Sequence, residues 1–243
     1  IGNVKSSQGD GPGALLSHRQ ALEIAEKLAK GDPSNTKWQR DLSICHNKIG
    51  AAQAAKGDSL DALESFRKSH AIRDRLAIRD PSNTEWQRDL SVSYNRIGEM
   101  QEAQGADSEA LESYRKALVI AEKLTARDPA NMEWRRDLWV SYNKIGLVQA
   151  GQGDGPRALE SYKKGLEIAE KLAARDSTNM EWQRDLAISH DQIGDVQAAR
   201  GEKSAALASY QTSRVIRERL AARDASNTEW QRDLSISYLK IGN

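Results

Sequence analysis

The chain has 243 residues with 36 Lys and Arg against 35 Asp and Glu, a formal charge of +1. This balance argues against nucleic acid as a partner, because nucleic-acid-binding domains are usually strongly basic. No apolar run approaches the ~20 residues that cross a bilayer, so we expect no membrane partner. Cys45 is the only cysteine. It excludes an internal disulfide within one copy, and we expect a reducing, cytoplasmic location.

A tryptophan and an Ile-Gly pair each recur every 48 residues along the chain. The tryptophans are Trp38, Trp86, Trp134, Trp182 and Trp230, and the pairs begin at Ile1, Ile49, Ile97, Ile145, Ile193 and Ile241. We therefore divide the chain into five periods, 1–48, 49–96, 97–144, 145–192 and 193–240, plus the start of a sixth. We expect residues 1–243 to form a single repeat domain, as a fragment of a longer protein.

The first predicted helix of each period carries a stripe of side chains spaced three or four residues apart. Around the second tryptophan the stripe consists of Trp86, Leu90, Tyr94, Ile97 and Gln101. Upstream of that stripe, Ser82-x-x-Glu85 has the spacing of a capping box, which predicts the helix start. We expect the helix to end near Gly105.

The second predicted helix begins around Asp107-Ser108 and ends at Asp128-Pro129. It carries a second stripe at the same spacing, namely Ala110, Leu111, Tyr114, Ala117, Leu118, Ala121 and Leu124. A turn glycine joins the two helices in each repeat: Gly9, Gly57, Gly105, Gly153 and Gly201. No segment alternates like a strand, so we predict an all-α fold. A lone hairpin cannot cover its apolar face, so neighbouring copies should stack into a solenoid.

The order Tyr94-x-x-Ile97-Gly98, Gly105, Ala110-x-x-x-Tyr114 and Ala117 resembles the tetratricopeptide repeat signature. That family has a period of about 34 residues, so this chain is similar to its long-repeat members of the kinesin light chain type. The resemblance implies a right-handed superhelix of antiparallel helix pairs. It also implies a concave groove, lined by the first helices, that holds an extended peptide or a partner helix.

An exposed polar strip is predicted on the first helices, opposite the tryptophan stripe. Arg88 and Asn95 project roughly 180 to 200° away from Trp86, and Glu99 is close by. The equivalent positions form one row of Arg40, Arg88, Arg136 and Arg184 and a second row of Asn47, Asn95, Asn143 and Asp191. Asparagine can pair with a peptide backbone and arginine with carboxylates, so these rows predict binding of an extended, acidic peptide.

A second interpretation of the same rows is structural. In it, each arginine pairs with an aspartate such as Asp89 or Asp137 on a neighbouring repeat, and the asparagines bond adjacent helices. Both interpretations remain open at this stage.

Catalysis is not expected, because the sequence has no nucleophile elbow, no phosphate-binding loop and no Cys-His arrangement. The four histidines share no metal-ligand spacing, so we expect neither metal nor cofactor. The leading hypothesis is a protein-interaction scaffold. One alternative is a structural module that self-associates head to tail through residues 1–9 and 227–243. Another is a scaffold or sensor segment of a larger bacterial-type signalling or effector enzyme.

Overall fold

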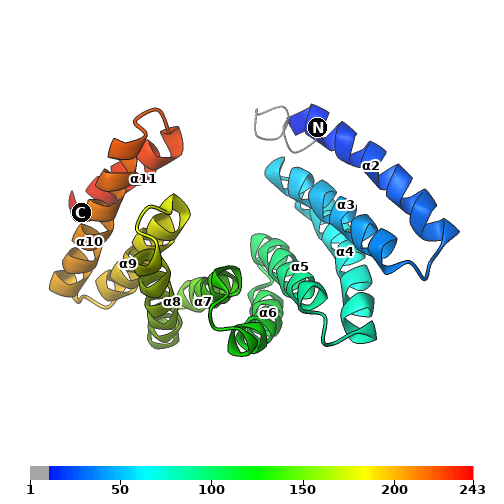
Figure 1. The fold of residues 1–243 in the computed structure, drawn as a ribbon. Coiled ribbons are helices and arrows are strands. Elements are labelled where there is room, and N and C mark those ends of the chain that lie inside the picture. Colours follow the sequence, from blue (N-terminus) through cyan, green and yellow to red (C-terminus); the bar gives the residue numbers. More distant parts are fainter. Residues whose placement is uncertain (1–10, 243) are drawn as a thin grey trace. The chain divides into compact units, whose positions relative to one another are not determined.

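The computed structural model describes residues 11–242, and this part of the chain consists of helices without any strand (Figure 1). The helices are α2 (Gly11–Gly31), α3 (Thr36–Ala55), α4 (Ser59–Arg79), α5 (Thr84–Ala103), α6 (Asp107–Arg127), α7 (Met132–Gly151), α8 (Gly155–Arg175), α9 (Met180–Ala199), α10 (Lys203–Arg223) and α11 (Thr228–Gly242). The predicted all-α class is confirmed. The predictions for Ile1-Gly2, for Gly9 and for self-association through residues 1–9 fall outside the described residues. Of the C-terminal segment 227–243, the structure describes 227–242.

The helices repeat with the period of the sequence. The first helices α3, α5, α7, α9 and α11 begin at residues 36, 84, 132, 180 and 228, which are 48 apart. The second helices α4, α6, α8 and α10 begin at 59, 107, 155 and 203, with the same interval. Each complete first helix has 20 residues and each of these second helices has 21.

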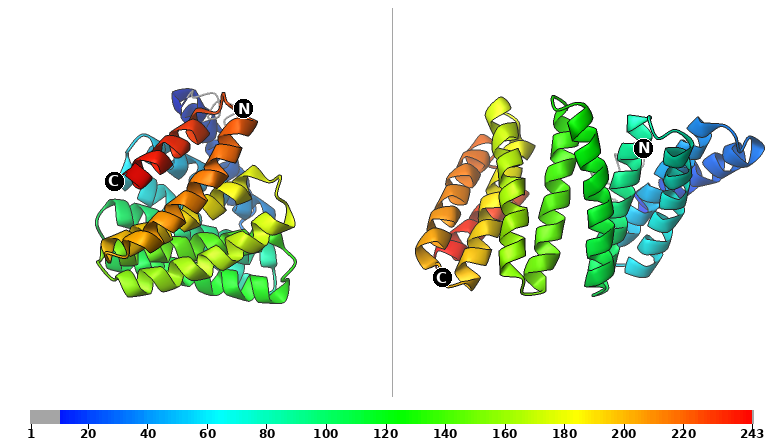
Figure 2. Two further views of the ribbon diagram at one scale, coloured as in Figure 1. Left: turned by 90° about the vertical axis from the view of Figure 1, so that its left-hand side faces the viewer. Right: turned by 90° about the horizontal axis from the view of Figure 1, so that it is seen from below.

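The chain divides into two compact units, one ending at Leu124 and the other beginning at Thr125. Within the first unit, α2, α3 and α4 each pack against the next helix, and side-chain contacts join α5 to α6. Within the second unit the same holds from α7 to α11, and Figure 2 shows the side-by-side packing of α8, α9 and α10. Each unit is therefore a stack of antiparallel helix pairs. The prediction of one continuous domain over residues 1–243 stays a prediction.

The first helices start one residue later than the predicted capping box. The N-cap of α5 is Asn83, whose side-chain oxygen accepts from the backbone N–H of Trp86 at 3.1 Å. Ser82 instead donates its hydroxyl to Asp80 at 2.6 Å, in the turn before the helix. The capping-box assignment of Ser82 and Glu85 is therefore wrong, because asparagine one residue on already satisfies the first-turn donor. This leaves the Glu85 side chain available for another repeat.

The turn glycines adopt the left-handed conformation that glycine permits. Gly57, Gly105, Gly153 and Gly201 have φ values of +87°, +74°, +76° and +76°. A side chain at this φ would be strained, which explains why each hairpin turn uses glycine.

The glycine of each Ile-Gly pair allows the two helices of a hairpin to approach closely. A Cβ atom on Gly98 would stand 2.6 Å from the Tyr114 ring, and one on Gly146 would stand 2.5 Å from the Tyr162 ring. The glycine thus makes room for the aromatic side chain of the second helix, which is fully buried at Tyr114. The predicted close approach at Gly98 is confirmed, with Tyr114 as the residue that fills it.

The glutamine within the apolar stripe bonds the two helices of its hairpin. Ser113 of α6 donates to the Gln101 side-chain oxygen of α5 at 2.7 Å. The same bond joins Ser65 to Gln53, Ser161 to Gln149 and Ser209 to Gln197. The polar atoms of Gln149 and Ser161 are buried, and this bond offsets the cost of removing them from water.

Successive repeats contact each other through residues at the start of the first helix. Trp230 of α11 packs against the cluster of Ala187, Ile216 and Leu220 from the preceding hairpin. In the first unit, the residue after the tryptophan bonds the end of the preceding hairpin. Gln87 of α5 donates to the Ala77 carbonyl of α4 at 3.1 Å. This bond satisfies one of the last carbonyl groups of α4, which has no partner within its own helix.

Candidate interaction surface

The arginine row connects first helices of successive repeats. Arg40 Nε lies 2.6 Å from Asp89 Oδ2, and Arg40 Nη1 lies 2.9 Å from Glu85 Oε1. In the second unit Arg136 pairs with Asp185 at 2.6 Å and Glu181 at 3.0 Å, and Arg184 pairs with Asp233 at 2.8 Å and Glu229 at 2.7 Å. These three arginines therefore make the inter-repeat contacts of the structural interpretation. Arg88 holds the same position on α5 and is half-buried.

Burial and hydrogen bonding have opposite effects on the pKa values of these arginines. Burial alone would lower the pKa of Arg40, but its hydrogen bond to Asp89 raises that pKa above the ordinary value. The hydrogen bond to Asp185 likewise raises the pKa of Arg136. Asp185 is only 4% exposed, and this burial raises the pKa of its carboxyl despite the contact with Arg136. About a third of each arginine side chain stays exposed. The outer contacts to Glu85 and Glu181 are therefore worth at most about 1 kcal/mol each.

The asparagine row lies inside the hairpins rather than on an exposed strip. Asn95, Asn143 and Asp191 are buried, and Asn47 is half-buried. The Asn143 side-chain nitrogen donates to the Trp139 carbonyl at 2.8 Å and lies 3.0 Å from where a Cβ on Gly165 of α8 would stand. The expected exposure of this row is therefore wrong. The second helix of the same hairpin contacts the row at Asn143 and at Asp191.

Each member of that row keeps one oxygen without a hydrogen-bond partner among the described residues. The atoms are Oδ1 of Asn47, Asn95, Asn143 and Asp191. The other oxygen of Asp191 forms a buried ion pair with Arg217 of α10 at 2.6 Å. Glu99, the remaining predicted residue, is half-buried and pairs with Arg96 of its own helix at 2.8 Å. Contact between these side chains and a peptide stays a prediction.

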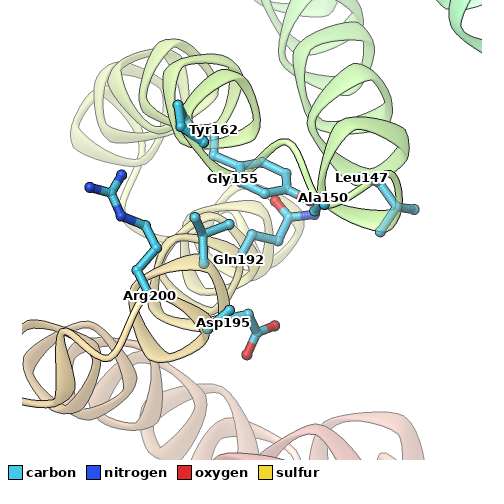
Figure 3. Close-up of a pocket in the computed structure, with 11 residues that line it drawn as sticks. Leu147, Ala150, Gly155, Tyr162, Gln192, Asp195 and Arg200 are labelled. Carbon is cyan, nitrogen blue, oxygen red and sulfur yellow. The ribbon is translucent and has the colours of Figure 1, made fainter.

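A cavity of about 350 Å³ opens between α7, α8 and α9 in the second unit (Figure 3). Its apolar walls are formed by Leu147 and Ala150 of α7, Pro156 and Tyr162 of α8, and Val196 of α9. Its polar lining residues are Gln192, Asp195 and Arg200, all from α9 or its C-cap. Figure 3 shows the Arg200 and Asp195 side chains on different sides of Gln192, pointing away from each other.

A second cavity of about 480 Å³ is lined by Tyr210 and Lys240 among others, and both of these residues contact Asp195 of the first cavity. The Asp195 carboxylate accepts from the Tyr210 hydroxyl at 2.9 Å and from Lys240 Nζ at 2.6 Å. Burial, together with the hydrogen bond to Asp195, raises the pKa of Tyr210 well above its ordinary value, so Tyr210 remains a hydrogen-bond donor. The Lys240 ammonium also lies 5.3 Å from the centre of the Tyr210 ring.

Sequence reasoning did not find the cavity residues. One signal was present, because Leu147 occupies a position that holds Glu99 in the preceding repeat and Asp195 in the following one. An apolar residue at a polar position of the repeat marks a local departure. The sequence at Leu147 did not indicate that α8 and α9 leave a cavity beside this side chain.

Within residues 11–242, no group of three or more His, Cys, Asp and Glu side chains is arranged to hold a metal ion. None of the described helices combines the length and apolarity that crossing a bilayer requires.

Comparison with known proteins agrees with this architecture. Residues 93–129 match the tetratricopeptide repeat family. No curated protein matches the sequence. Among solved structures, BtubC (BKLC) from P. vanneervenii is 17% identical, with a TM-score of 0.66 over 94% of this chain and 83% of that chain. A Podosopora anserina protein described as a kinesin light chain with nearly identical TPR-like repeats is 16% identical, with a TM-score of 0.63 over 93% and 94% of the two chains.

The Rap conjugation gene regulator of plasmid pLS20, solved in complex with the Phr* peptide, is 18% identical with a TM-score of 0.63. The similarity covers 98% of this chain and 55% of the Rap chain. At these identities the structures establish the fold, which is that of the TPR-like repeat proteins. The predicted resemblance to long tetratricopeptide repeats is thereby confirmed.

Proposed function

We propose that this chain of tetratricopeptide-like repeats is a protein-interaction scaffold whose first helices bind a peptide or a partner helix. The observation that carries the proposal is the cavity between α7, α8 and α9, where Leu147 remains 43% exposed beside apolar walls. An open apolar cavity with a few polar groups at its edge is the common form of a recognition site. The TPR-like Rap regulator, which was solved with a peptide, supports this kind of ligand.

The arginine row supports repeat stacking more strongly than it supports capture of an acidic peptide. Arg40, Arg136 and Arg184 already contact an Asp and a Glu each. A ligand carboxylate would have to displace one of these groups, which removes most of the electrostatic gain. We therefore place the ligand on the α7 and α9 surface and treat an acidic ligand as the less favoured class.

The test is selection of binding peptides from a random dodecapeptide library, followed by hydrogen exchange of the chain with and without the best peptide. We expect slower exchange in residues 132–151 and 180–199, which are α7 and α9. Protection confined to the outer faces of α8 and α10 would contradict binding through the first helices. Failure to enrich any peptide would contradict the scaffold function itself.

Self-association is a second candidate, favoured by an exposed apolar face on α2. Ile24 is 61% exposed and Leu28 is 41% exposed, whereas Ile72 and Leu76 at the same positions of α4 are 6% and 5% exposed. Leu239 of α11 is also 64% exposed. Sedimentation velocity over a range of concentrations tests this candidate, and a constant monomer mass at high concentration would exclude it.

A further inference from the structure

The place in the first unit that corresponds to the α7–α9 cavity carries a longer side chain than the cavity does. At the position of Val196, the first unit has Met100, which packs against the cluster of Ala62, Leu63, Phe66 and Ile97. Val196 instead belongs to a cluster with Ala158, Tyr162 and Ile193. Valine lacks the reach of methionine, and the space that methionine occupies in such a site stays open here.

The start of α8 adds to this opening. A Cβ on Gly155 would stand 3.7 Å from Val196 and 3.9 Å from Arg200, so this glycine lies directly over both side chains. Pro156 follows at the start of the helix, where its missing N–H has no consequence for helix bonding. Val196 and Gly155 are thus smaller than Met100 and Ser59 at the same positions of the first unit, which leaves more space here. Leu147 stands where the first unit has Ala51 and adds an apolar side chain to the wall of the cavity.

The charges at the edge of the cavity are already paired within the chain. Arg200 Nε lies 2.8 Å from Glu202 Oε1, and Lys240 Nζ lies 2.6 Å from Asp195 Oδ1. A ligand thus meets little unbalanced charge there, and its apolar contacts must supply most of the binding. One polar group is unused, because the Gln192 side-chain oxygen is buried without a partner among the described residues. It can accept a hydrogen bond from an N–H group of a ligand.

We propose that this cavity is the subsite for one aliphatic or aromatic side chain of an extended peptide, with a peptide N–H adjacent to that side chain bonded to Gln192. The inference rests on the proposed scaffold function and names the chemistry that this surface selects. The volume of about 350 Å³ lies near the lower end of the range for ligand sites, roughly 300–1,000 Å³, and suits a single anchoring side chain. Because the edge charges are paired, binding should depend weakly on salt.

The experiment fills the cavity or makes its wall polar, with residues that the chain itself carries at the equivalent positions of other repeats. Val196→Met copies Met100, and Leu147→Glu copies Glu99. The matched control is Met100→Val, which makes the reciprocal change in the first unit. Affinity for the best library peptide is measured by fluorescence anisotropy at low and high salt. Each position of the peptide is replaced by alanine in turn, and the melting temperature of each variant is recorded.

We expect both cavity variants to weaken binding by roughly tenfold or more. Val196→Met fills the cavity and excludes the anchoring side chain, and Leu147→Glu places a charge on the apolar wall that this side chain would contact. Met100→Val should leave the affinity within about twofold, and one apolar peptide position should dominate the alanine scan. If Val196→Met lowers the melting temperature, Leu147→Glu carries the test, since Leu147 is 43% exposed.

Four results would overturn the inference. Peptides that bind equally well to both cavity variants would place recognition elsewhere, while the scaffold function stands. Enrichment of acidic peptides whose binding is lost at high salt would make the arginine row the binding site. If sedimentation shows that the cavity variants abolish self-association, a second copy is the occupant. No enriched peptide at all would contradict the scaffold function together with the subsite.

Discussion

The hairpins α3–α4 and α9–α10 each contain a buried arginine on the second helix, in different surroundings. Arg73 is 4% exposed and Arg217 is 6% exposed, whereas α6 and α8 have the fully buried Ala121 and Ala169 at this position. Both guanidinium groups donate at 2.9 Å to a backbone carbonyl of the next first helix, that of Asp89 or Asp233. The two hairpins thus use the same main-chain anchor.

The two hairpins differ in the residue of the first helix that faces the buried arginine. Arg217 pairs with Asp191 at 2.6 Å, and both side chains are 7% exposed. The first unit has the neutral Asn47 where the second has Asp191. Burial lowers the pKa of Arg73 and raises the pKa of Asp191, so each charged form carries a desolvation cost. The comparison teaches that one buried cation can be held by backbone oxygens, while a buried anion needs its cation.

The largest expected effect is that of Arg217→Ala. It leaves the Asp191 carboxylate buried without a counter-charge and should lower the free energy of unfolding by about 3–5 kcal/mol. Urea denaturation measures this change. The control is the double variant Arg217→Ala with Asp191→Ala, which should recover much of the loss. A double variant as unstable as the sum of the single variants would show that the two side chains are not coupled.

A smaller loss is expected for Arg73→Ala, about 1–3 kcal/mol in the free energy of unfolding. This change removes the hydrogen bond to the Asp89 carbonyl and the weaker contact to Ser43 at 3.4 Å, without exposing a buried anion. The same urea titration compares it with Arg217→Ala. Equal losses for the two variants would mean that the Asp191 charge does not account for the difference between the hairpins.

The smallest effects should be equal in the two units. Asn83 and Asn179 cap α5 and α9 through the same bond to a tryptophan N–H, 3.1 Å in each. Replacing either by alanine should cost about 1 kcal/mol. Because the local geometry is repeated, the two variants should lose the same free energy of unfolding. This loss is obtained from the change in urea midpoint multiplied by the slope of free energy against urea concentration. A clear inequality would show that the caps are stabilised differently by their surroundings.

Local sequence signals predicted the hairpins well. The period of 48, the turn glycines and the stripes of Leu90 and Ile97 depend on contacts within one repeat, which spacing along the chain reveals. The N-cap was placed one residue early, since Ser82 and Asn83 both suit that role by type. Only the backbone geometry shows that Asn83, and not Ser82, accepts the hydrogen bond from the Trp86 amide.

The candidate site was harder to predict because its properties depend on more than one helix. A helical wheel places Asn95 opposite Trp86, but it does not say whether a neighbouring helix covers that side. Asn95 and Asn143 are both buried, and α8 covers Asn143. The arginine row was correctly recognised as a repeated feature, and its contact with Asp89 was one of two interpretations that spacing could not separate.

The sequence by itself determined the helices, their turns and their 48-residue repetition, because these follow from backbone preferences and from side chains a few residues apart. Tertiary structure alone decided which polar side chains are covered, that Arg40 reaches Glu85 and Asp89, and that a cavity remains beside Val196. Those outcomes depend on distances of a few ångströms between helices separated by a whole repeat, and a one-dimensional pattern does not specify such distances.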